Sequence, residues 1–171
     1  MEHNAIERAK AWASNEYFDE ASRNEIQELL DKGDEKELTE RFYKDLEFGT
    51  GGIRSIIGQG ANRINTYTVR KATQALSNEV LRAGKEEGLS EFKVAISFDS
   101  RKFSFEFAKE VASVLAGNGI HAYIYKRLNP VPLLSFSVRH HKAQAGVMVT
   151  ASHNPPTYNG YKLKGHFGGP L

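Results

Sequence analysis

Between residues 94 and 149 the sequence alternates short apolar runs with longer segments of helical periodicity, and this alternation limits the possible folds. The runs are rich in β-branched and aromatic residues, which are typical of strands, and lie at 94–98, 120–125 and 146–149. Helices are predicted between them, one with apolar residues from 107 to 115 and one over 131–141. Helices that connect apolar strands imply right-handed crossovers and a parallel sheet. The chain is therefore expected to be an α/β protein.

The first 43 residues differ, because charged residues surround apolar positions at helical spacing. Gly33 is expected to end one helix, and Asp34 followed by Glu37 resembles a capping box that opens the next. We expect residues 1–43 to form a helical arm packed on the domain, and a partner-binding role is the alternative. A separate long helix is predicted from its N-cap Thr68 through residue 83.

Glycines are concentrated between residues 48 and 60. Such a density suits tight backbone turns and close approach by a ligand, and predicts a glycine-rich hairpin. The segment is neither a P-loop nor a dinucleotide fingerprint, because it lacks Gly-Lys-Ser/Thr and the G-x-G-x-x-G spacing. The Arg54 guanidinium could hold two oxygens of one phosphate. An ion pair between Arg54 and a neighbouring carboxylate is the alternative.

A polar segment, T-A-S-H-N-P-P-T-Y-N-G-Y-K, follows the last apolar run and covers residues 150–162. Its prolines and its Asn-Gly pair predict a loop of fixed geometry with a turn near residue 160. Ser152 lies just past the strand, where a nucleophile would be exposed. Asp99 and Arg101 also follow a predicted strand. Since ligands gather beyond the carboxyl ends of parallel strands, these three residues are expected on one edge of the sheet.

The chemistry of Ser152 depends on its neighbours, because a serine hydroxyl is a weak nucleophile without a base, a metal or positive charge. Serine hydrolysis is disfavoured, since the spacing G-x-S-x-G is absent and His153 is too close in sequence for a simple triad. Phosphoryl transfer needs mainly positioning and charge neutralisation. Lys162, Arg54 and backbone N–H groups could supply that charge. A solvated surface position is the alternative for Lys162.

Four motifs occur in an order that resembles one family. T-A-S-H-N-P and N-G-Y-K closely resemble the active-site serine loop of the phosphohexomutases, phosphoglucomutase and phosphomannomutase. F-G-T-G-G-I-R at 48–54 and F-D-S-R at 98–101 are also similar to motifs of this family. The resemblance implies a three-layer α/β/α fold with a mostly parallel sheet. It also implies that residues 44–171 are the first of four domains, preceded by the arm at 1–43.

The resemblance further implies a role for each motif residue. Ser152 would be a phosphoserine that gives its phosphoryl group to a hexose monophosphate and regains one from the bisphosphorylated intermediate. His153 would contact substrate or phosphate, Lys162 would be a general acid/base, and Arg54 would steady a phosphate. The remaining candidates bind phosphate or shape the site: Thr150, Asn154, Gly51, Gly52, Asp99 and Arg101.

The resemblance also brings expectations about cofactors. Mg²⁺ prefers oxygen ligands, and in the family its carboxylates come from an Asp-Gly-Asp loop of the second domain, which this chain lacks. The chain could contribute only the phosphate on Ser152, and a hexose bisphosphate would act as activator. His140, His141 and His166 are not expected to bind a metal, because no carboxylate stands nearby at ligand spacing.

The composition excludes several other classes. A net charge of +2 with dispersed Lys and Arg does not favour nucleic acid or membrane, and the absence of cysteine excludes disulfides and thiolate zinc sites. No signal segment or membrane-spanning run is visible, so a cytoplasmic location is expected. A non-catalytic sugar-phosphate or partner-binding module, and less so a nucleotide-binding domain, stay open as alternatives.

The chain ends nine residues after Lys162. The sugar-recognition, metal and distal phosphate loops implied by the family would lie beyond that point. We therefore expect a fragment or truncated form that lacks turnover alone, binds Mg²⁺ weakly and tends to self-associate, with the remaining domains as its partners. Glucose phosphates are the favoured substrates.

Overall fold

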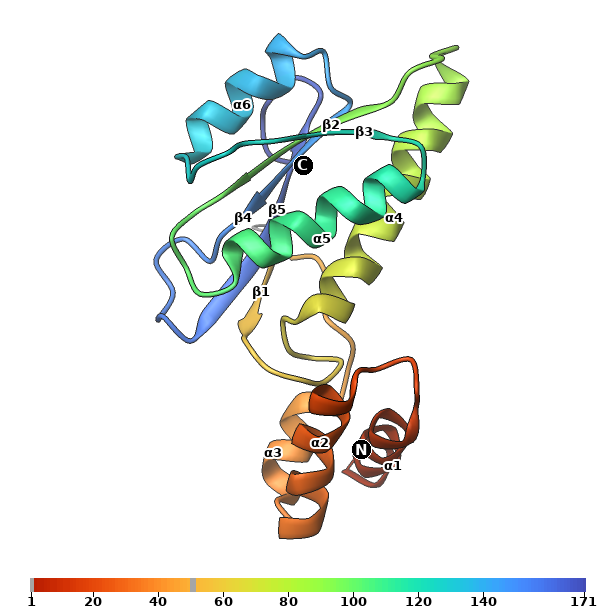
Figure 1. Ribbon diagram of the computed structural model, residues 1–171, viewed down its shortest axis with the longest axis vertical. Coiled ribbons are helices and arrows are strands. Elements are labelled where there is room, and N and C mark those ends of the chain that lie inside the picture. The colour runs from red at the N-terminus through yellow and green to blue at the C-terminus, as the bar shows by residue number, and fades with distance from the viewer. Residues whose placement is uncertain (1, 50–51) are drawn as a thin grey trace.

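A computed structural model of the chain describes residues 2–49 and 52–171. Figure 1 shows three N-terminal helices at one end of the long axis and a sheet with its covering helices at the other. The helices are α1 (Glu2–Ser14), α2 (Glu20–Lys32), α3 (Glu35–Phe42), α4 (Thr66–Glu86), α5 (Ser104–Gly117) and α6 (Val131–His140). The strands are β1 (Ile53–Ile56), β2 (Lys93–Phe98), β3 (His121–Ile124), β4 (Ala145–Val149) and β5 (Tyr158–Gly165). The candidate residue Gly51 lies outside the described residues.

Helices α1, α2 and α3 form the predicted arm around their own apolar core. Gly33 ends α2 in the left-handed conformation (φ 65°), and the Asp34 side chain accepts a hydrogen bond from the backbone N–H of Glu37. Both predicted helix boundaries are thus confirmed. The Trp12 ring stacks on Phe18 at 3.7 Å between ring centroids. Both rings belong to the arm core, which also packs against residues at the start of α4, so the arm is joined to the rest of the chain by apolar contacts.

The sheet has the strand order β1-β5-β4-β2-β3. Strand β2 pairs in parallel with β3 and with β4, whereas β5 pairs antiparallel with β4 and with β1. The predicted α/β/α class is confirmed, and the sheet is mixed. Parallel pairing is confined to β4, β2 and β3, where helices connect the strands. The chain returns from β4 to β5 through a short loop, and a short connection permits only an antiparallel neighbour.

Helices cover both faces of the sheet. Alternate residues of β2 point to opposite sides, so Val94 and Ile96 pack with α4 and α5, while Ala95 packs with Leu134 and Val138 of α6. Gly146 of β4 lets α6 approach closely, because a Cβ atom there would lie 2.6 Å from Val138 Cγ2. The result is a three-layer arrangement with its main core between the sheet and the α4–α5 pair.

Three local predictions were wrong. The Asn159-Gly160 pair lies inside β5 rather than in a turn, because tertiary contacts outweigh the turn preference of this dipeptide. The segment 48–60 is not a self-contained hairpin: Gly49 bridges to Gly52, but β1 pairs with β5. Asn65, not Thr68, caps α4. The Asn65 side chain accepts from the Thr68 N–H, and the Thr68 hydroxyl accepts from the Asn65 N–H.

Candidate active site

Ser152 lies in the loop that joins β4 to β5, here called the serine loop (residues 150–157). The residue is exposed, and its backbone has φ 59° in the left-handed region. A non-glycine residue in this region is uncommon and is held there by its surroundings against a strain of about 1–3 kcal/mol. Next to it, Ala151 is fully buried, and its carbonyl accepts from the Asn154 N–H at 3.1 Å. The loop therefore presents Ser152 outward from a buried attachment point.

A hydrogen-bond chain fixes the backbone of Ser152. The Asp99 carboxylate accepts a hydrogen bond from the Thr150 hydroxyl at 2.5 Å, and that hydroxyl accepts from the Ser152 N–H at 2.9 Å. The other Asp99 oxygen accepts from the Ser104 hydroxyl at 2.7 Å and from the Arg101 N–H at 3.0 Å. Thr150 is only 4% exposed. Through these bonds Asp99 links the carboxyl end of β2 rigidly to the serine.

Arg101 donates to four backbone carbonyls, three in the serine loop and one at the start of β5. Its Nη2 donates to the carbonyl oxygens of Ser152 at 2.8 Å and Asn154 at 2.7 Å. Its Nη1 donates to those of Pro155 at 2.9 Å and Tyr158 at 3.1 Å. Hydrogen bonds from a charged donor are stronger than neutral ones, and the planar guanidinium fixes their directions. Arg101 therefore shapes the loop, and its nitrogens are engaged by the chain itself.

Two cations lie on the face of β1 and β5 opposite to α4 and α5. Arg54 is exposed, and its Nη1 lies 3.4 Å from Asn154 Oδ1 of the serine loop. Arg54 stands opposite Gly160 in the strand register, and Lys162 follows two residues later on the same face. Burial lowers the pKa of Lys162, and the charges of Arg54 and Lys164 lower it further, while Asp99 opposes the change. The predicted residues Arg54, Asn154 and Ser152 are thus brought together.

Two glycines explain how closely the strands approach beneath the site. A Cβ atom at Gly160 would lie 2.5 Å from the carbonyl oxygen of Thr150 and 2.6 Å from that of Ile53. At Gly52, where φ is +90°, it would lie 2.4 Å from the carbonyl oxygen of Tyr161. Glycine is therefore required at both positions, and Gly52 shapes the packing of the segment before β1 against β5.

Asn159 also belongs to this support, although sequence reasoning did not identify it as a site residue. Its side chain is fully buried and donates to the Lys102 carbonyl and to the Ser104 hydroxyl, both at 3.0 Å. Ser104 also donates to Asp99, so Asn159 connects β5 to the same network. The Asn-Gly pair was the available signal, and it was assigned to a turn. His153 is exposed on the loop, where it could reach a ligand.

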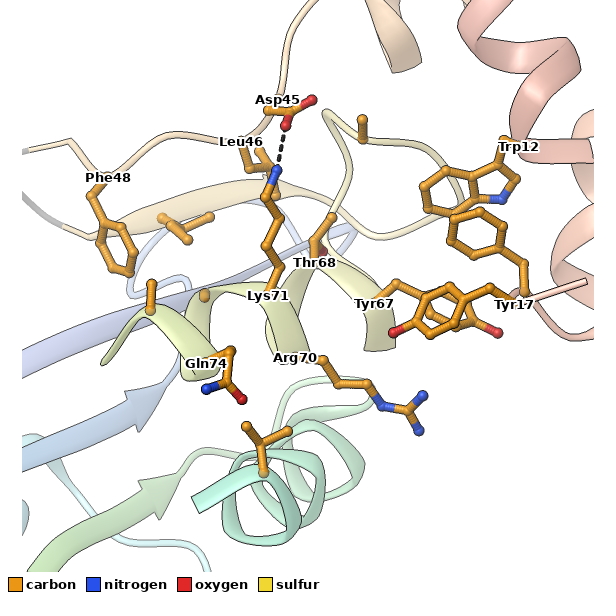
Figure 2. Close-up of a pocket in the computed structure, with 16 residues that line it drawn as sticks. Trp12, Tyr17, Asp45, Leu46, Phe48, Tyr67, Thr68, Arg70, Lys71 and Gln74 are labelled. Carbon is orange, nitrogen blue, oxygen red and sulfur yellow. Dashed lines mark hydrogen bonds and ion pairs between the residues drawn. The ribbon is translucent and has the colours of Figure 1, made fainter. Parts of the chain in front are cut away.

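A large concavity lies away from the serine loop, between the arm and α4, with a volume of about 670 Å³. Figure 2 shows Trp12, Tyr17 and Tyr67 at one end of it and Phe48 at the other. Lys71 on its rim pairs with Asp45, and Arg70 pairs with Glu110 at 2.7 Å. Its lining is mainly apolar and its cations are paired, so it does not resemble a phosphate site.

The residues of the serine loop do not supply a metal site by themselves. Within residues 2–49 and 52–171, no group of three or more His, Asp or Glu side chains is placed to hold a metal ion. Asp99 is the carboxylate nearest the loop in the described network, and both its oxygens already accept hydrogen bonds.

In the part of the chain that the structure describes, every helix is too short or too polar to cross a membrane.

Comparisons with known proteins agree with this geometry. A family model described as phosphoglucomutase/phosphomannomutase, alpha/beta/alpha domain I, matches residues 45–171. A phosphoglucomutase of Staphylococcus saprophyticus is 42% identical over 146 residues, which are 85% of this chain and 26% of the relative. A human phosphopentomutase is 35% identical over 147 residues, covering 81% of this chain and 23% of the relative.

A solved structure from Thermus thermophilus, described as a "putative phosphomannomutase", is also similar. It has a TM-score of 0.66 and 37% identity, and the match covers 75% of this chain and 27% of that one. The chain thus spans about a quarter of the length of the relatives it matches. From the matched residues and the shared fold we conclude that the chain belongs to the phosphoglucomutase/phosphomannomutase family and contains its α/β/α domain I.

Proposed function

We propose that this chain is the catalytic-serine domain of a sugar-phosphate mutase, in which Ser152 carries the transferred phosphoryl group. The observation that carries the proposal is the placement of Ser152, which is exposed on a loop anchored by Asp99 and Arg101 beside the guanidinium of Arg54. Phosphoryl transfer depends mainly on positioning and charge neutralisation, and this loop offers both. Membership of the family supports the same reaction class.

The reaction proceeds by two transfers at Ser152. A hydroxyl oxygen of a hexose monophosphate attacks the phosphorus of phosphoserine, the bond from phosphorus to Ser152 Oγ breaks, and the sugar becomes a bisphosphate. The attacking hydroxyl gives its proton to Lys162, and the leaving Ser152 Oγ, which is exposed, takes up a proton from water. After the sugar turns over, Ser152 Oγ returns its proton to water as it attacks the other phosphate, and Lys162 gives its proton to the leaving sugar oxygen. The net result converts hexose 1-phosphate into hexose 6-phosphate, with glucose favoured.

The surrounding residues bind and orient in this scheme. Arg54 neutralises charge on the phosphoryl group, and it is suited to do so because its neighbour on the serine loop, Asn154, carries no charge. His153 contacts the substrate or its phosphate from the exposed loop. Thr150, Asp99 and Arg101 do not react, because their polar atoms are engaged in holding the loop.

In this scheme the chain is part of a longer enzyme, since it spans about a quarter of the length of its relatives. Residues 1–43 are the arm and residues 44–171 the first domain, and the sugar-selecting and distal phosphate-binding parts are supplied by further domains. In the complete enzyme a bound Mg²⁺ would neutralise charge on the phosphate of Ser152, which is the one ligand that this chain would contribute, and its carboxylate ligands would come from another domain. The chain alone is accordingly expected to show no mutase turnover.

The test is intact-mass spectrometry of the chain before and after incubation with glucose 1,6-bisphosphate, followed by peptide mapping. Addition of one phosphoryl group to Ser152, absent in Ser152→Ala, supports the proposal. Ser113→Ala on α5 is the matched control, because Ser113 is an exposed serine whose hydroxyl donates to the Lys109 carbonyl of its own helix. Binding of the bisphosphate without labelling would instead favour a non-catalytic sugar-phosphate module.

A further inference from the structure

A second lysine accompanies Lys162 on β5. Lys162 stands opposite Met148 of β4 and Lys164 opposite Gly146, so both lysines project from the same face of the sheet. Both are partly buried. Arg54 of the neighbouring strand β1 stands opposite Gly160, which places a third cation on this face. Three cations therefore follow one another along β1 and β5 from the serine loop outward.

This row of cations lacks the carboxylates that pair with buried and partly buried arginines elsewhere in the described residues. Arg41 lies 2.5 Å from Glu25, and Arg63 lies 3.2 Å from Glu37. By contrast, in the described part of the chain no carboxylate lies within 4.0 Å of the side-chain nitrogens of Arg54, Lys162 or Lys164. A nearby positive charge disfavours the protonated form of a lysine when no carboxylate offsets it. Among these cations the lysines lose a proton more easily than the arginine does, so the effect falls on them.

The groups that face Lys162 from other elements do not change this balance. Lys162 and Lys164 line a concavity of about 180 Å³ with Val131 of α6 and with Pro170 and Leu171 after β5, whose side chains carry no charge. Leu171 also bears the terminal carboxylate of the chain, which forms no ion pair within 4.0 Å with either lysine in the described residues. Across β4 the neighbour is Met148. The Asp99 carboxylate raises the pKa of Lys162, and Thr150, Ser104 and Arg101 already donate hydrogen bonds to that carboxylate.

We propose that Lys164 is a positioning residue for Lys162: its positive charge, held on the same face of β5, favours the neutral amine of Lys162 and suits that amine to exchange a proton rather than to act as a fixed cation. The direction agrees with the pKa of Lys162, which is lowered by burial first and then by Arg54 and Lys164. The role of Lys162 as acceptor of the substrate proton rests on the proposed function. The electrostatic coupling of Lys162 and Lys164 does not rest on it.

The experiment measures the protonation of Lys162 directly in the 171-residue chain. Lysines are dimethylated with carbon-13 formaldehyde, the Lys162 resonance is assigned by its loss in Lys162→Arg, and its chemical shift is followed from neutral to alkaline pH. Lys164→Gln removes the neighbouring charge and is expected to raise the apparent pKa of Lys162. Lys164→Met, which keeps the apolar stem, provides a second neutral variant. Lys164→Arg retains the charge and is expected to leave the titration near that of the unsubstituted chain.

Lys109→Gln is the matched control, because Lys109 lies on α5 on the opposite side of the sheet, over the Phe105 ring. It should not move the Lys162 titration. The proposal is overturned if Gln and Met at position 164 leave the Lys162 titration unchanged, or if Arg moves it as much as they do. Added salt should weaken the difference between Lys164→Gln and the unsubstituted chain, since partly exposed charges are screened. Ser152 labelling is read separately, so a failure of the mutase proposal is distinguishable from a failure of the coupling.

Discussion

Replacing Arg101 by alanine is expected to release the serine loop, because one guanidinium donates to three carbonyls of the loop and to the Tyr158 carbonyl at the start of β5. Hydrogen bonds from charged donors contribute about 1.5–3 kcal/mol each. The bonds to Ser152 and Pro155 are exposed, so water can replace them, while those to Asn154 and Tyr158 are partly buried. Counting only the two partly buried bonds at the lower value predicts a loss of about 3 kcal/mol.

The loss can be measured in two ways. Urea unfolding reports the global free energy, and amide hydrogen exchange shows whether the loop opens locally without unfolding the sheet. The Arg101→Ala variant should exchange the amide of Ser152 much faster, because the loop loses the bond to the Ser152 carbonyl and opens more often, which breaks the bond from the Ser152 N–H to the Thr150 hydroxyl. Arg101→Lys should lie between the two, because an ammonium keeps the charge but not the planar fork.

Arg82→Ala is the matched control. Arg82 is exposed on α4 and pairs with Glu79 and Glu86 of its own helix, so its removal should change the free energy of unfolding far less than Arg101→Ala does, because exposed ion pairs contribute little. The reasoning is refuted if Arg101→Ala keeps both the urea midpoint and the loop protection of the unsubstituted chain.

Three further changes test other parts of the structure. Gly160→Ala should destabilise the chain by about 1–3 kcal/mol, because its Cβ atom would clash with backbone carbonyl oxygens. Gly117→Ala is the control, since a Cβ atom there has open space around it. Equal melting temperatures of the two variants in thermal unfolding would contradict this prediction. Tyr161→Phe should lose about 1 kcal/mol in urea, because it removes the buried contact at 3.2 Å with the Thr73 hydroxyl; an unchanged midpoint would speak against that bond. Burial raises the pKa of Glu37, but hydrogen bonds and charge from Arg41 and Arg63 lower it, and the net direction is below its ordinary value. Its stabilising contribution should therefore be present above the unfolded pKa and be lost as the pH falls through the folded pKa, and urea titrations at several pH values should show a weaker acid loss in Glu37→Gln.

The parallel half of the sheet was predictable from the sequence because its signals are local. The apolar runs that became β2, β3 and β4 are separated by helices whose periodicity shows directly in the residues. Gly33 and Asp34 likewise mark helix boundaries through their own backbone and side-chain preferences. Each of these features can be recognised without knowing what lies across from it.

The antiparallel half could not be predicted in the same way. Strand β5 contains an Asn-Gly pair and alternates lysines with apolar residues, so its strand character depends on β1 and β4 at its sides. For the site, sequence reasoning placed Asp99, Arg101 and Ser152 on one edge, and the structure brings them into one hydrogen-bond network. The four carbonyl contacts of Arg101 depend on loop geometry, which no spacing in the sequence encodes.

The left-handed backbone of Ser152 also limits which side chains this position accepts. Threonine offers the same hydroxyl group, but its branched Cβ is poorly tolerated at φ 59°. Asparagine and glycine suit the backbone, but they have no hydroxyl to accept a phosphoryl group. The main-chain geometry of the loop therefore favours serine over threonine at this position.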